Sequence, residues 1–354
     1  MMRPETPPLY RSTATATTAA PPACLQFAPW DSTLLVVGTY SLHEHETGPE
    51  KHKTGSLELY RLSTARTAQL RHLHSLPTPG GAVLDIKFCG ATLVVALSRG
   101  AITLYAIVAA DDDGDARIVL RDTLQLFSPD VLVLSLAPLP GLETGGAGAG
   151  AGGVVACTRS DGGVAIVDLA TGRVRNEYVP HTLEAWTCEW AGGGGQTLYS
   201  GGDDAVFVVL DVRSGAEVTR SRRGAHDAGV TALLARGSGG GGVGEGQLCS
   251  GSYDEVLRVW DLRGAAIRAV DRLALGGGVW GLQQMPQAAA EGRVLASCMH
   301  AGARVVDVGA GRPEVVARWE DNGSMNYGSH VHADTPQVVA SCSFYDRRVC
   351  IWSI

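Results

Sequence analysis

The chain has 354 residues, of which 45% are hydrophobic and 18% are charged, and its formal net charge is -7. This composition supports a large packed core and excludes a largely disordered chain. The acidic balance argues against a nucleic-acid-binding surface, and no apolar run reaches the length of a membrane span.

The first 20 residues form a leader that is rich in threonine and alanine. Residues 10–18 of this leader are predicted to supply an outer strand to the last repeat of the chain. Two degenerate repeat units follow, each with an inner strand, a second apolar strand and a third strand. They comprise residues 23–29, 34–41 and 56–62 in the first unit, and residues 82–88, 92–100 and 101–108 in the second.

Five clearer units occupy the rest of the chain. Each has a strand, a tight turn that in most units contains aspartate, and a second strand of alternating apolar residues. They comprise residues 157–168, 200–211, 250–261, 297–308 and 341–353, and their ends recur every 43 to 50 residues. This is the period of WD-type repeats with loop insertions. We therefore predict an all-β fold, a seven-bladed β-propeller of WD40-type repeats over residues 21–354, and expect it to be a monomer.

The cysteine pattern indicates the cellular compartment. The chain has 8 cysteines, none in a Cys-x-x-Cys pair, and most lie in apolar, strand-like runs. The N-terminal residues lack the apolar segment of a secretory signal peptide. We therefore expect free thiols and a cytoplasmic location.

Many conspicuous polar residues are expected to belong to the scaffold. In WD repeats a histidine, a serine, the turn aspartate and a tryptophan satisfy one another inside the blade, because buried polar groups persist only when they are paired. The predicted sets are His226, Ser250, Asp254 and Trp260 in the fifth blade, and His181, Ser200 and Asp204 in the fourth.

Other residues are expected on one face of the disc. The position before the turn aspartate, aligned across the blades, holds Ser160, Asp203, Tyr253, Met299 and Tyr345. Aligning the starts of two inner strands sets Glu184 and Trp186 beside Gly278 and Trp280. Exposed aromatic side chains at the mouth of a propeller favour ligand binding. The alternative for each tryptophan is partial burial between blades.

His300 occupies the turn position at which other blades have Asp204, Asp254 and Asp346. It lacks the upstream histidine of a complete scaffold set, because Gly276 stands there. A residue that departs from the structural pattern in this way is a candidate for function, and histidine suits a general base. The alternative is simple degeneracy of this blade.

A metal site is not expected. His43, Glu44, His45 and His52 could in principle bind a metal, but they lie in a charged segment with glycine and proline. A solvated loop is the better interpretation, and the sequence predicts no metal or other cofactor.

Six motifs occur in the order HTLEAW, YSGGDD, GSYDE, GGGVW, ASCMHAG and ASCSFYD. Together they resemble the WD-repeat diphthine methyl ester hydrolases of diphthamide biosynthesis, called diphthine methyltransferases in older usage. The resemblance covers residues 181–354. It implies hydrolysis of a methyl ester on a modified histidine of translation elongation factor 2, which would be the partner. Where the family tends to have Tyr-Gly-x-Asp-Trp, this chain has Tyr-Gly-Ser-His-Val from Tyr327, so His330 stands in place of the aspartate.

The resemblance suggests a division of roles on the rim. His300 is predicted to activate water, with Asp203 or Glu184 orienting it, while Tyr253 or Tyr345 donates to the developing oxyanion. Trp186 and Trp280 are predicted to hold the trimethylammonium group of diphthine by cation–π contact. The alternative function is a non-catalytic WD40 scaffold that docks a partner protein on the same face.

Overall fold

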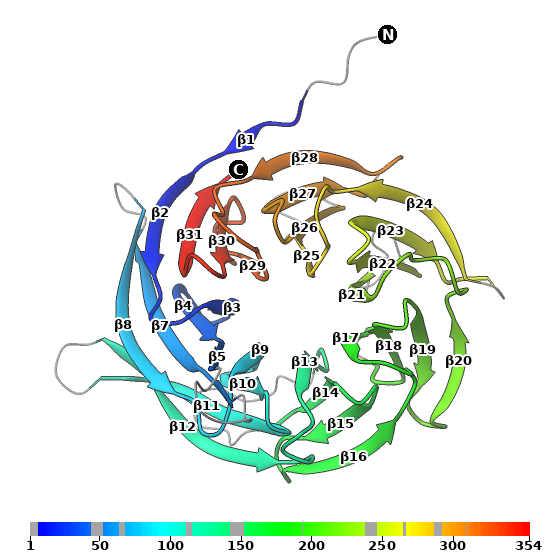
Figure 1. The fold of residues 1–354 in the computed structure, drawn as a ribbon, viewed down its shortest axis with the longest axis horizontal. Helices are drawn as coiled ribbons and strands as arrows, with labels where there is room; N and C mark the ends of the chain where they lie inside the picture. Colours follow the sequence, from blue (N-terminus) through cyan, green and yellow to red (C-terminus); the bar gives the residue numbers. More distant parts are fainter. Residues whose placement is uncertain are drawn as a thin grey trace.

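The computed structural model describes residues 6–43, 52–63, 68–110, 115–141, 152–192, 194–237, 246–264, 267–286, 292–309 and 311–354. The described residues form strands joined by turns, arranged as seven radial sheets around a central axis (Figure 1). This confirms the predicted seven-bladed β-propeller. No helix in the described ranges is long and apolar enough to cross a membrane.

Blades 1 to 5 are antiparallel sheets whose four strands follow one another outward from the axis in chain order, and blades 6 and 7 each add a strand from the start of the chain at the outer edge. Blade 1 consists of β3 (Pro22–Ala28), β4 (Asp31–Thr39), β7 (Ser56–Ser63) and β8 (Gln69–Pro77). Blade 2 consists of β9 (Val83–Cys89), β10 (Thr92–Leu97), β11 (Ala101–Ala109) and β12 (Ala116–Gln125). Blade 3 consists of β13 (Val133–Pro138), β14 (Val154–Arg159), β15 (Val164–Asp168) and β16 (Arg173–Tyr178).

The remaining blades follow the same plan. Blade 4 consists of β17 (Ala185–Trp190), β18 (Thr197–Gly202), β19 (Phe207–Asp211) and β20 (Ala216–Arg220). Blade 5 consists of β21 (Val230–Arg236), β22 (Gln247–Ser252), β23 (Val256–Asp261) and β24 (Arg268–Ala274). Blade 6 consists of β25 (Gly281–Gln284), β26 (Arg293–Ser297), β27 (Ala303–Asp307) and β28 (Glu314–Trp319). Blade 7 contains β29 (Ser329–Val331), β30 (Val338–Ser343) and β31 (Arg348–Ser353).

The ring is closed by the start of the chain. Strand β2 (Ser12–Thr17) pairs antiparallel with β31 and is the outer strand of blade 7. Strand β1 (Leu9–Tyr10) adds in parallel to β28 of blade 6 (Figure 1). The indole of Trp319 donates to the hydroxyl of Ser12 at 3.1 Å, which also links blade 6 to this segment.

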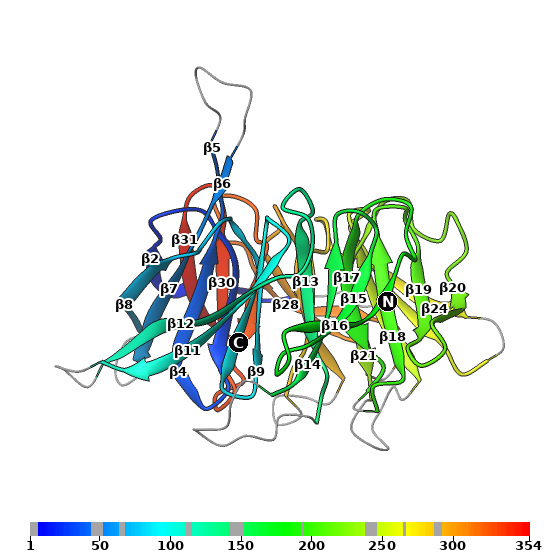
Figure 2. The same cartoon turned by 90° about the horizontal axis from the view of Figure 1, so that it is seen from below.

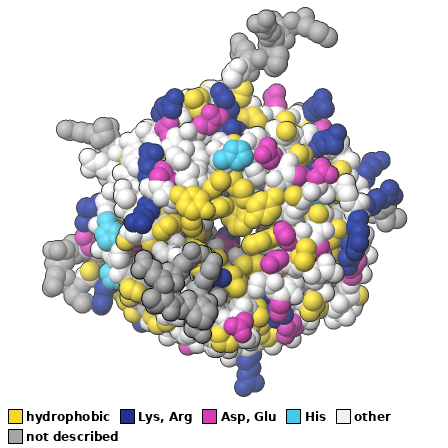
Figure 3. Space-filling model, viewed as in Figure 1, with side chains coloured by type: hydrophobic (Ala, Val, Ile, Leu, Met, Phe, Trp, Pro, Cys, Tyr) yellow, Lys and Arg dark blue, Asp and Glu magenta, His cyan; other side chains and the backbone are white. Residues whose placement is uncertain are grey.

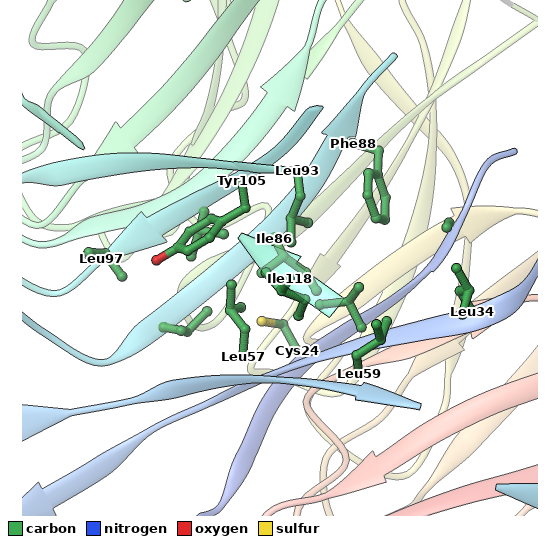
Figure 4. Packing of buried hydrophobic residues seen from close by; sticks show 14 of the residues in the cluster. Cys24, Leu34, Leu57, Leu59, Ile86, Phe88, Leu93, Leu97, Tyr105 and Ile118 are labelled. Carbon is green, nitrogen blue, oxygen red and sulfur yellow. The ribbon is translucent and has the colours of Figure 1, made fainter. Parts of the chain in front are cut away.

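Apolar side chains fill the wedges between adjacent blades. Strand residues that alternate in direction bury one set against the next blade, so every sheet is covered on both faces. Figure 4 shows the wedge between blades 1 and 2, where Leu57 and Leu59 meet Ile86 and Leu93. All four side chains are buried, and such contacts repeat around the ring.

A two-stranded hairpin is inserted between β4 and β7. It consists of β5 (Ser41–His43) and β6 (His52–Thr54), and Figure 2 shows it standing out from one face of the disc. The rings of His43 and His52 stack with centroids 4.8 Å apart. The candidate metal residues Glu44 and His45 lie outside the described residues.

The scaffold network in blade 4 has the predicted contacts. His181 lies 3.0 Å from Asp204 through Nδ1 and 2.9 Å from Ser200 through Nε2. In blade 5, Ser250 contacts Nε2 of His226 and accepts from the indole of Trp260, both at 2.8 Å. Asp254 differs from the prediction, because it forms a buried ion pair with Arg258 at 2.7 Å instead of binding His226. The guanidinium competes successfully because it is a permanent charge with several donors.

His226 should make the protein sensitive to acid. Burial and the nearby Arg258 lower the pKa of His226 to about 4, although Asp254 acts in the opposite direction. His226 in the unfolded chain therefore binds a proton below about pH 6.5, whereas His226 in the folded chain binds it only below about pH 4. Stability from this group is complete above that window and is lost as the pH falls through it.

A His226→Gln variant should show a shallower loss of unfolding free energy between pH 6.5 and 4 than the parent, by about 1–3 kcal/mol. Urea denaturation at a series of pH values measures this difference. The slopes of the two proteins should agree above pH 7, and identical slopes below pH 6.5 would contradict the assignment.

Candidate functional site

Five aromatic rings form a continuous arc on the face that carries the hairpin. Neighbouring ring centroids lie 5.2 to 6.3 Å apart, within the range of favourable aromatic pairs. Figure 3 shows hydrophobic side chains gathered around the hollow at the centre of this face. The aromatic arc consists of Trp186, Tyr253, Trp280, Tyr327 and Phe344.

The fold brings the arc together from two kinds of connection. Trp186, Trp280 and Tyr327 lie at the starts of the inner strands of blades 4, 6 and 7, where the chain enters from the preceding blade. Tyr253 and Phe344 lie in the turns after the second strands of blades 5 and 7. Both kinds of connection open onto the same face, so residues far apart in sequence become neighbours around the axis.

Two carboxylates lie beside the Trp186 end of the arc. The indole of Trp186 donates to Oδ1 of Asp203 at 2.9 Å, and the backbone N–H of Asp203 donates to the carbonyl of Glu184 at 2.8 Å. The pKa of Tyr253 is raised, chiefly by burial and further by Tyr327, Asp203 and Glu184. This part of the arc is therefore both aromatic and negatively charged, which suits a cation.

The structure places the predicted binding residues in different settings. Trp186, Tyr253 and Trp280 contact one another, with centroid distances of 5.5, 5.7 and 6.3 Å. Tyr345 instead contacts Phe344 at 5.0 Å and is 70% exposed at the edge of the arc. Both tryptophans are half-buried.

His300 lies in the turn between β26 and β27, at the expected position. The closing bond from Cys298 N–H to the Gly302 carbonyl matches the bond from Gly202 to Val206 in blade 4. The backbone differs, however, because Met299 has φ of 42°, and Asn322 binds the carbonyls of Met299 and His300. The blade 6 turn is thus held by the loop that leads into blade 7.

The predicted orientation of His300 by Asp203 or Glu184 is not found. Its Nε2 lies 4.0 Å from a carboxylate oxygen of Glu255 in the neighbouring blade, and its side chain is 57% exposed. Asp203 is engaged by Trp186 instead. The reason is geometric, since turns of adjacent blades meet on the rim while Asp203 lies two blades away.

A channel of about 340 Å³ runs inward from the arc along the axis. Trp186, Trp280 and Tyr327 contribute to its wall near the mouth. A polar residue lies three positions after each of these aromatic residues, and it also lines the channel. These residues, with the corresponding ones of blades 1 and 2, make up a polar ring of Gln26, Lys87, Glu189, Gln283 and His330.

The charged members of the polar ring are held in defined states. Lys87 binds Oδ1 of Asp85 at 3.0 Å, and Oδ2 of Asp85 accepts from the backbone N–H of Leu136 at 2.9 Å. Burial would lower the pKa of Lys87, but Asp85 raises it overall, so the amine is charged. Burial raises the pKa of Glu189 to about 7, against the opposing effects of the Ala235 backbone and Lys87.

Two buried atoms of the polar ring lack partners. Among the described residues, nothing lies in hydrogen-bonding geometry with Oε1 of Gln26 or Nδ1 of His330. Burial and the charge of Lys87 lower the pKa of His330 to about 3, so its ring is neutral. Buried polar atoms without partners are uncommon in folded proteins.

Reasoning from sequence missed Tyr327, Phe344, Lys87 and Glu189. A signal was present for part of the set, because Trp186 precedes Glu189, Trp280 precedes Gln283 and Tyr327 precedes His330 by the same three residues. Within the described ranges there is no group of three or more histidine, cysteine, aspartate or glutamate side chains arranged to hold a metal.

Comparison with solved structures supports the architecture. A chain in the crystal structure of the mitotic checkpoint complex superposes with a TM-score of 0.65, covering 96% of this chain and 93% of that chain. The two sequences are only 14% identical, so this likeness concerns the fold alone.

Comparison with curated proteins gives a family. No family model matches the chain. The diphthine methyltransferase homolog of Dictyostelium discoideum is 23% identical over 373 residues, covering 93% of this chain and 95% of that protein. The human diphthine methyltransferase is 28% identical over 298 residues, which cover 77% of this chain and 62% of the human protein. Diphthine methyltransferase of Schizosaccharomyces pombe is 30% identical over 325 residues, covering 90% of both proteins. The chain therefore belongs to the diphthine methyltransferase family.

Proposed function

We propose that this protein hydrolyses the methyl ester of diphthine methyl ester on translation elongation factor 2, in the cytoplasm, and so yields diphthine. Membership in the family supports a role in diphthamide biosynthesis. The observation that carries the proposal is the cluster of Trp186, Tyr253 and Trp280 beside Glu184 and Asp203, at the mouth of a polar channel.

The chemistry of the substrate matches this mouth. Diphthine methyl ester carries a trimethylammonium group and the methyl ester on the same carbon atom. A quaternary ammonium cannot donate hydrogen bonds, so aromatic faces and nearby carboxylates are the groups that stabilise it. A ligand whose ammonium contacts the two indoles has its ester at the entrance of the channel. Tyr345, exposed at the edge, is available to contact the surface of the elongation factor.

Incubation with elongation factor 2 carrying diphthine methyl ester tests the proposal. We expect loss of one ester methyl by mass spectrometry, with release of methanol and no requirement for a methyl donor. A methyl transferase would instead require a donor and would add mass to the factor. Binding of the factor without any change in its mass would favour the scaffold function and contradict hydrolysis.

The sequence-based hypothesis places the catalytic base at His300, with Asp203 or Glu184 beside it. The contact with Glu255 replaces that partner, so the hypothesis now concerns a His300–Glu255 pair on the rim. If this pair activates water, His300→Ala should lower kcat by about 10²–10⁴-fold in the methanol-release assay. A normal kcat in a folded His300→Ala protein would remove His300 from the mechanism.

A further inference from the structure

His300 lies on the exposed rim of the disc, which is a poor position for a base that acts on a buried ester. His300 is more than half exposed, and it is not among the residues that line the channel. Ester hydrolysis is faster where water is limited and the charged groups are fixed, because electrostatic interactions are stronger there. The polar ring lies inside the channel behind the aromatic mouth, and the Lys87 side chain there is 39% exposed, less than the 57% of His300.

We propose that the hydrolytic centre lies in the channel, with Glu189 as the general base and Lys87 as the donor to the developing oxyanion. This proposal rests on the proposed esterase function. It names two groups that neither the sequence motifs nor the family relationship indicates. Their side chains come from blades 4 and 2 and line the same channel.

The distance from the mouth to the polar ring suits the substrate. Three strand residues separate Trp186 from Glu189, which corresponds to about 10 Å along the strand. The substrate and the attacking water together fill a distance of this order. The ammonium lies within about 6 Å of a ring centroid, and the carbonyl carbon is two bonds further on. The attacking water lies about 3 Å beyond that carbon and is hydrogen-bonded to the base. The channel volume of about 340 Å³ is also within the range of small-molecule sites.

The two groups have the properties that the step requires. Glu189 lines the channel, and burial raises its pKa to about 7, which suits a base that must also return a proton. Lys87 is charged and anchored by Asp85, which itself accepts from Leu136, so its ammonium is fixed before substrate arrives.

Hydrolysis then proceeds through a single tetrahedral intermediate. Water attacks the carbonyl carbon while Glu189 accepts one of its protons, and Lys87 donates a hydrogen bond to the oxygen that becomes negative. The tetrahedral intermediate then breaks its bond to the methoxy oxygen, and protonated Glu189 gives the proton to that oxygen. Methanol leaves, and the carboxylic acid loses its proton to solvent, so that its carboxylate remains beside Lys87.

Single-turnover methanol release from the methyl-esterified factor tests this assignment. Glu189→Gln is expected to lower the rate by about 10²–10⁴-fold, with the half-saturating concentration changed less than threefold. Lys87→Met is expected to lower it by about 10²–10³-fold. The matched control is Glu217→Gln, the same change at an ion pair with Arg220 on the outer strand of blade 4, which should remain within twofold of the parent.

The possible outcomes distinguish failure of the esterase function from failure of the channel assignment. If the parent protein releases no methanol, the esterase function fails. If the parent is active and folded Glu189→Gln has a similar rate, the channel assignment fails while the function stands. If thermal melting shows that Glu189→Gln does not fold, Glu189→Met, which also lacks a base, replaces it, and a parental rate in that variant overturns the assignment.

Discussion

Replacing Trp186 and Trp280 together with alanine is expected to lower kcat/KM for the esterified factor by about 10- to 10³-fold, most of it through KM. Each indole contributes about 0.5–2 kcal/mol of cation–π attraction to a bound ammonium, and both are lost together. The neighbouring carboxylates Asp203 and Glu184 remain, so some attraction for the cation persists.

The matched variant replaces both tryptophans with phenylalanine. Phenylalanine keeps an aromatic face, so kcat/KM should fall by less than about tenfold. Tetramethylammonium provides an independent probe, because it should inhibit the parent competitively and the alanine variant much less. A parental KM in the double alanine variant, or inhibition by tetramethylammonium that both proteins share, would show that the ammonium binds elsewhere.

An aspartate at position 16 is expected to destabilise the protein by about 2–4 kcal/mol. Ala16 lies on β2, half-buried against the apolar cluster between blades 7 and 1, where Val349 and Ile351 are buried. A carboxylate there either loses its hydration or separates the closing strand from β31. Chemical denaturation measures the loss, which should lower the urea midpoint by about 1–2 M.

Thr17→Asp is the control for this experiment. Thr17 is the next residue on the same strand, its side chain is exposed, and it pairs with Arg348 of β31. The variant should lie within about 0.5 kcal/mol of the parent, as surface changes usually do. Equal stabilities for both variants would mean that β2 contributes little to closure of the ring.

The fold was predictable because each repeat carries its own strand pattern. Segments such as residues 250–261 combine an apolar strand, an aspartate turn and a second strand ending in Trp-Asp, and the structure forms β22 and β23 from this segment. The early blades were predicted from alternation alone. Blade 6 kept the register of its turn although His300 replaces aspartate, because the hairpin closes through backbone bonds that do not depend on that side chain.

The site was less predictable, because its contacts join different blades. Aligned repeats indicate which face Trp186 and Tyr253 share, but they do not show that His300 meets Glu255 or that Asp203 binds an indole. The inner strands of blades 2 and 4 also contain bulges near their starts, which change the direction of side chains by one position. The channel residues Lys87 and Glu189 therefore could not be assigned from alternation alone.

The depth of the channel has a consequence for proteins that are not substrates. Cells contain methyl esters of ordinary aspartate and glutamate side chains, whose esters stand only two or three bonds from the backbone. With bonds of about 1.5 Å, such an ester reaches at most about 5 Å from the backbone, which is less than the spacing of about 10 Å between Trp186 and Glu189. The diphthine side chain begins beyond the imidazole ring of a histidine and is long enough to pass the aromatic mouth. Under the channel mechanism, the reach of the modified side chain would by itself protect other esterified proteins from hydrolysis.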